Sequence, residues 1–71
     1  MTSQYITIQI NGEPFNCLSQ MSLLDIISYL NIDSRLVLLE YNGIILSDMQ
    51  ISNIFVNQND KLEIITIVGG G

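Results

Sequence analysis

Two Asn-Gly pairs, each set between stretches rich in apolar residues, limit most strongly what this chain can fold into. Asn11-Gly12 follows residues 5–10, where isoleucine alternates with polar or aromatic residues, and Asn42-Gly43 separates residues 36–41 from residues 44–46. Both residues of such a pair tolerate a positive φ, which two-residue hairpin turns require. The sequence therefore predicts two β-hairpins.

The alternation in the first hairpin also assigns faces to its strands. In a strand, successive side chains point to opposite sides, so Ile6, Ile8 and Ile10 share one face. Phe15 and Cys17 share a face of the returning strand. Pro14 has no N–H to donate to a neighbouring strand, so this strand should lie at an edge of the sheet.

Between the hairpins the apolar period changes from two to that of a helix. Ser22 is a favourable N-cap residue, and Asp25, three positions on, resembles the second member of a capping box. Asn31 can adopt the left-handed conformation that ends many helices. The sequence predicts a helix over residues 22–30, with an apolar stripe of Leu23, Ile26, Ile27 and Leu30.

The segment after the second hairpin predicts less regular structure and then a final strand. Ser47 and Gln50 have capping-box spacing, so we expect one helical turn over residues 49–54. Residues 57–60 are polar and predict a turn. Residues 61–68 should form the last strand, with Leu62 and Ile64 facing the helix.

This order of elements predicts one α+β domain over residues 1–68 with a β-grasp (ubiquitin-like) fold. One helix covers only one sheet face, so the first hairpin and the last strand must share a mixed sheet of four to five strands. The chain has 71 residues, of which 48% are hydrophobic, which suits a small domain that must fill its core. Residues 69–71 should be a flexible C-terminal glycine tail.

Charge excludes several classes of partner. The net charge is −5, and Arg35 and Lys61 are the only cations, so we expect neither nucleic-acid binding nor attachment to an anionic membrane. No apolar run reaches transmembrane length, and the N-terminus lacks the basic region of a signal peptide. The acidic balance favours a partner with a basic docking face.

The chain lacks the side chains that most catalytic sites need. It contains no histidine and one cysteine, so it cannot form a Ser-His or Cys-His pair or a zinc site. Its seven carboxylates are scattered among turns, caps and strands. We expect a protein that is not an enzyme and holds no metal or bound cofactor. Cys17 should be a small buried hydrophobe in a reducing compartment.

The three C-terminal glycines have two interpretations. They can be a frayed end, as termini often are. Alternatively they have a function, because glycine lacks Cβ and lets a backbone enter a narrow channel. Such a tail presents the α-carboxylate of Gly71 to a partner, which could use ATP to convert that carboxylate into an acyl-adenylate.

The β-grasp order combined with a Gly-Gly end resembles the ubiquitin-like sulfur carriers, and among them the thiamine-biosynthesis carriers most. The resemblance spans essentially the whole chain: "YITIQINGEPFNC", "SLLDIISYL", "EYNGII", "NQNDKLEI" and Gly70-Gly71. The family pattern asks for two glycines, and Gly69 adds a third. The molybdopterin sulfur carriers share the fold and the Gly-Gly end, but their chains tend to be longer. A ubiquitin-like protein modifier or a plain interaction domain would also be compatible with this order of elements.

This resemblance implies a reaction cycle. An E1-like adenylating enzyme would use ATP to adenylate Gly71, with Gly69 and Gly70 threading into its site. A sulfur-donating persulfide enzyme would then supply the sulfur of a thiocarboxylate, which would pass to thiazole synthase. The expected compartment is the cytoplasm, or the plastid stroma if the chain is plastid-encoded.

The last predicted strand also suggests a docking surface. If Leu62 and Ile64 face the helix, Ile65 and Ile67 point outward, and Leu38 could join them. An exposed apolar cluster on so small a domain favours a partner site, here for the adenylating enzyme. The alternative is a strand buried on both faces.

Overall fold

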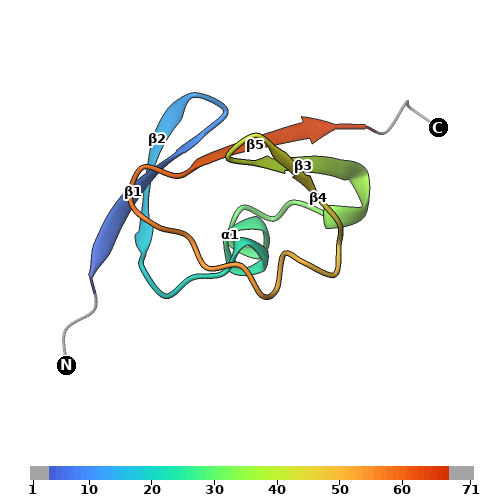
Figure 1. Cartoon of the computed structure of the whole chain (residues 1–71). Helices are drawn as coiled ribbons and strands as arrows, with labels where there is room; N and C mark the ends of the chain where they lie inside the picture. Colours follow the sequence, from blue (N-terminus) through green and yellow to red (C-terminus); the bar gives the residue numbers. More distant parts are fainter. Residues whose placement is uncertain (1–3, 68–71) are drawn as a thin grey trace.

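The computed structural model describes residues 4–67, which form a five-stranded mixed sheet curved over one α-helix (Figure 1). The strand order is β2-β1-β5-β3-β4, with β1 and β5 parallel and the other neighbours antiparallel. The predicted β-grasp fold is confirmed, with five strands. The elements are β1 (Tyr5–Ile10), β2 (Glu13–Leu18), α1 (Leu23–Tyr29), the 3₁₀-helix η1 (Ser34–Leu36), β3 (Val37–Tyr41), β4 (Ile44–Leu46) and β5 (Lys61–Thr66).

Both hairpins form at the Asn-Gly pairs. Asn11 and Gly12 have φ of 52° and 83°, and Asn42 and Gly43 have φ of 49° and 88°. These left-handed conformations match the twist of the flanking strands. Strand β2 lies at one edge of the sheet, as Pro14 predicted.

The backbone N–H groups at the start of α1 are satisfied from two sources. Ser22 Oγ accepts from the Asp25 N–H at 3.1 Å, and Asp25 Oδ2 accepts from the Ser22 N–H at 3.0 Å, so the predicted capping box is confirmed. The Leu23 and Leu24 N–H groups donate to carbonyls in the loop between β4 and β5. This loop therefore anchors the helix as well as covering it.

The helix ends as Asn31 predicted. Asn31 has a φ of 60°, its N–H donates to Ser28 O at 3.1 Å, and the Ile32 N–H donates to Ile27 O at 3.0 Å. This pair of bonds is the Schellman motif, which satisfies carbonyls that the helix leaves unpaired.

The core lies between the sheet, α1 and the loop that connects β4 to β5. Leu23, Ile26 and Ile27 contribute the helical stripe, as predicted, and the sheet and loop supply the rest. The buried apolar residues are Ile8, Cys17, Leu23, Ile26, Ile27, Leu39, Ile51, Val56 and Leu62. Burial raises the pKa of the Cys17 thiol, which agrees with its expected role as a small buried hydrophobe.

The helical turn predicted over residues 49–54 is wrong, because residues 48–53 form consecutive turns. Gln50 Oε1 accepts from the Ser47 N–H at 2.8 Å, as in a capping box, but the Ser47 hydroxyl donates to the same oxygen instead of accepting from the Gln50 N–H. The carbonyls of Ile51 and Ile54 accept bonds from the first N–H groups of α1. These carbonyls point to another element, so they do not support a helix of their own.

Two predicted strand limits also shift. Asp33 Oδ1 accepts from the Arg35 N–H at 2.9 Å and begins η1, so β3 starts at Val37 and not at residue 36. Strand β5 ends at Thr66, although the Ile67 N–H still donates to Leu36 O at 3.0 Å. Val68, the predicted strand end, lies outside the described residues.

The polar turn predicted before β5 is confirmed, and Asp60 organises it. Asp60 Oδ2 accepts from the Asn57 N–H at 2.7 Å and from the Tyr41 hydroxyl, while Asp60 Oδ1 accepts from Asn42 Nδ2 at 3.2 Å. Partial burial, together with the bond to Asp60, raises the pKa of Tyr41 to about 12.

Replacing the helix cap should lower stability. Because Ser22→Ala removes the acceptor for the Asp25 N–H, we expect the free energy of unfolding in urea to fall by about 1 kcal/mol. Ser28→Ala, an exposed change inside α1, is the control and should leave that energy within about 0.5 kcal/mol of wild type. Equal losses in both variants would contradict a capping role for Ser22.

Tyr41 should make stability depend on alkaline pH. Its pKa in the folded chain is raised from 10.0 to about 12, so its hydroxyl proton is held more tightly in the folded state. The resulting stabilisation is present below pH 10 and is lost as pH rises toward 12. Urea unfolding across this window should show a steeper loss for wild type than for Tyr41→Phe. Parallel curves would refute the assignment.

Candidate functional site

The predicted docking residues meet on the sheet face turned away from α1. Leu38 of β3 is the direct cross-strand partner of Ile65 in β5. Ile67 follows on the same side and is tied by its N–H to Leu36 O. The structure therefore brings Leu38, Ile65 and Ile67 together as the sequence predicted.

The exposed fractions decide between the two interpretations of the last strand. Ile65 is 44% exposed and Ile67 is 54% exposed, whereas Leu62 on the helix side is 1% exposed. Leu38 is half-buried. The alternative of a strand buried on both faces is wrong for the described part of β5.

Two further apolar residues belong to this surface, and the sequence pattern did not reveal them. Ile45 of β4 pairs with Glu40 of β3, lies diagonal to Leu38 and is 61% exposed. Leu36 is also exposed and lies beside Ile67. The register set by Asn42-Gly43 could have located Ile45, but no pattern indicated that Leu36 would lie in a 3₁₀-helix. We call Leu36, Leu38, Ile45, Ile65 and Ile67 the outer apolar patch.

Two glutamates border this patch. Glu40 and Glu63 are direct cross-strand partners, so two like charges sit side by side on the outer face. Such pairs oppose sheet formation by a small amount. Among the described residues the ion pair present joins Arg35 to Asp33 at 2.8 Å, and it lowers the pKa of Asp33 to about 2. Lys61 lies on the same face, two positions before Glu63, and the described residues include no ion pair with either glutamate.

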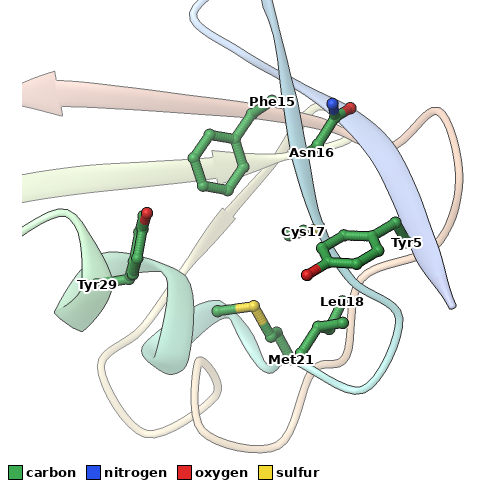
Figure 2. A pocket seen from close by; sticks show the side chains of 7 residues that line it. All are labelled: Tyr5, Phe15, Asn16, Cys17, Leu18, Met21 and Tyr29. Atoms are coloured by element: carbon green, nitrogen blue, oxygen red, sulfur yellow. The ribbon is translucent and has the colours of Figure 1, made fainter. Parts of the chain in front are cut away.

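A pocket of about 280 Å³ lies away from this patch, between β2 and α1 (Figure 2). Phe15 meets Tyr29 edge to face, with ring centroids 6.1 Å apart. The residues that line the pocket are Tyr5, Phe15, Asn16, Cys17, Leu18, Met21 and Tyr29. None of these residues is Asp, Glu, Lys or Arg, and burial raises the pKa of the Cys17 thiol, which makes it a poor nucleophile.

Residues 4–67 contain no group of three or more His, Cys, Asp or Glu side chains that could hold a metal ion. None of the helices in that range is long and apolar enough to cross a bilayer. Gly69, Gly70 and Gly71, the predicted site of chemistry, lie outside the described residues. The surface next to β5 is thus the part of the predicted site that the structure defines.

Known proteins resemble this chain in sequence and in fold. An uncharacterized protein, ycf40 of Pyropia yezoensis, is 48% identical over 71 residues, the full length of both chains. A thiazole synthase of Paramagnetospirillum magneticum is 39% identical over 62 residues, which are 87% of this chain and 19% of that protein. The crystal structure of the thiamine biosynthesis protein ThiS from Geobacter metallireducens shares the fold, with a TM-score of 0.80, 23% identity, and coverage of 93% of this chain and 100% of that one.

The family comparison reaches past the described residues at the C-terminal end. The model of the ThiS family matches residues 8–71. This range includes the second half of β1, the other four strands, α1 and the three terminal glycines. The chain belongs to the ThiS family, the ubiquitin-like sulfur carriers that its sequence predicted.

Proposed function

We propose that this protein is the sulfur carrier of thiamine thiazole synthesis and carries sulfur as a thiocarboxylate on Gly71. The observation that supports this most is the extent of the family match, which runs through the glycines to residue 71. The described residues offer no metal cluster, and their single cysteine is buried and protonated. The reactive group is then the terminal carboxylate, and partner enzymes supply the catalysis.

The proposed cycle begins with ATP bound to an E1-like adenylating enzyme. A carboxylate oxygen of Gly71 attacks the α-phosphate, forming an acyl-adenylate and releasing pyrophosphate. A persulfide on the sulfur-donating enzyme then attacks the carbonyl carbon, and AMP leaves. A partner thiol cleaves the resulting acyl disulfide, which leaves the thiocarboxylate on Gly71 and a disulfide on the partners.

The similarity to a segment of a thiazole synthase supports that enzyme as the acceptor of the sulfur. In the Paramagnetospirillum protein a stretch resembling this chain belongs to the same polypeptide, which suggests that carrier and synthase act together. This similarity and the family match favour the thiamine pathway over molybdopterin synthesis. We place the reaction in the cytoplasm, or in the plastid stroma if the gene is plastid-encoded.

We further propose that the outer apolar patch docks on the adenylating enzyme. The patch spans η1, β3, β4 and the end of β5, and a partner would bury its exposed isoleucines. The Glu40–Glu63 pair at its border favours a basic side chain on the partner, which would relieve their repulsion. Gly69 and Gly70 would thread into the catalytic channel beyond this contact.

Intact mass should reveal the thiocarboxylate. After incubation with ATP, an E1-like enzyme that accepts the chain and a persulfide donor, the wild type should gain the mass difference between sulfur and oxygen. Deleting Gly71 should abolish the gain and leave urea unfolding unchanged, because the buried core runs from Ile8 to Leu62. Ladders of conjugates would instead indicate a protein modifier, and no change with competent partners would refute the carrier function.

A charge placed in the patch should weaken adenylation. Ile65→Asp should raise the KM for the carrier about tenfold or more, because a buried interface contact is replaced by a charge that must be desolvated. The matched control is Ile44→Asp, since Ile44 is 64% exposed but pairs with Tyr41 on the opposite sheet face. The rate of pyrophosphate release at varied carrier concentration gives the KM of each variant. Equal KM values for the two variants would rule out docking through the patch.

A further inference from the structure

Strand β5 continues past the point where its parallel neighbour β1 ends. Strand β1 pairs with β5 only through Gln9–Lys61 and Ile10–Leu62, and the last backbone bond between them runs from the Asn11 N–H to Leu62 O at 2.9 Å. The chain then turns away at Asn11-Gly12. Along a strand, the N–H and C=O groups of successive residues point alternately to the two neighbouring strands. The Ile67 N–H donates to Leu36 O on the β3 side, so the N–H and C=O groups of Ile64 and Thr66 point to the other side, where β1 has ended.

The side chain of Asn11 takes the place of the missing strand. The Ile64 N–H donates to Asn11 Oδ1 at 2.7 Å, and Asn11 Nδ2 donates to Ile64 O at 3.3 Å. A carboxamide carries the same donor and acceptor as a peptide group. Asn11 therefore adds one more residue of pairing to β5 at the point where β1 ends.

The second hairpin provides an internal comparison. Asn42 occupies the equivalent turn position, with nearly the same positive φ, and its Oδ1 accepts from the Lys61 N–H at 2.8 Å. The two turn asparagines thus hold the same strand at different places. Asn42 bonds to Lys61, the first residue of β5, and Asn11 bonds to Ile64, the fourth of its six residues.

We propose that Asn11 is a positioning residue for the C-terminal tail, an inference that rests on the proposed carrier function. Beyond Leu62, β5 is held on its second side by the two Asn11 bonds to Ile64. These bonds hold β5 as far as Ile64, three residues before the end of the described chain. A strand end that is already ordered loses less conformational entropy when a partner binds it, so the carrier binds more tightly.

The test replaces each turn asparagine with glycine. Glycine adopts the positive φ of both positions without strain, so Asn11→Gly and Asn42→Gly keep their turns and remove only the side-chain bonds. For Asn11→Gly, pyrophosphate release by the adenylating enzyme should show a KM raised about fivefold, the effect of losing roughly 1 kcal/mol of net hydrogen bonding, with kcat unchanged. Hydrogen exchange of the Ile64 amide should accelerate in the free variant.

Asn42→Gly controls for a general loss of stability. It should lower the free energy of unfolding as Asn11→Gly does, yet keep the wild-type KM. Equal KM values for Asn11→Gly and wild type, or an equal rise in both variants, would overturn the role of Asn11 alone. A wild-type chain that no adenylating enzyme accepts would overturn the proposed function, and the inference about Asn11 with it.

Discussion

Within residues 4–67, one seven-residue α-helix must shield a five-stranded sheet, and this constraint organises the rest of the structure. Helix α1 covers one face, so each strand needs apolar residues on that side only. The loop between β4 and β5 completes the cover through Ile51 and Val56 (Figure 1). The opposite face of the sheet stays open, and the proposed contact with a partner lies there.

Hydrogen bonds between distant segments hold these layers in register. Carbonyls of the long loop accept the first N–H groups of α1, so the loop and helix stabilise each other. The side chains of Asn11 and Asn42 supply β5 with hydrogen-bond partners where the backbone of its neighbours ends. Asp60 holds the turn before β5 by accepting from the Asn57 N–H. Polar residues in the turns thus determine where the central strand begins and how it ends.

The distribution of chemical groups separates presentation from catalysis. The buried Cys17 thiol is protonated, and the pocket beside it is lined by uncharged side chains. Four of the exposed apolar residues form the outer apolar patch with Leu38, on the face where Glu40 and Glu63 lie: Leu36, Ile45, Ile65 and Ile67. In the proposed function, this face would provide recognition, the tail would provide a carboxylate, and the partner enzymes would provide the reactive side chains.

The sequence alone determined the features that depend on residues close together in the chain. The Asn-Gly turns, the capping box of Ser22 and Asp25, and the alternation that turns Ile65 outward are of this kind. Tertiary structure decided what depends on pairing between distant segments. It turned residues 48–53 into turns whose carbonyls serve α1, placed Glu40 beside Glu63, and joined Asn11 to Ile64, which lies 53 positions further along the chain. The physical reason is that local patterns fix the conformation of a segment, whereas only the packed sheet sets the register that brings such groups into contact.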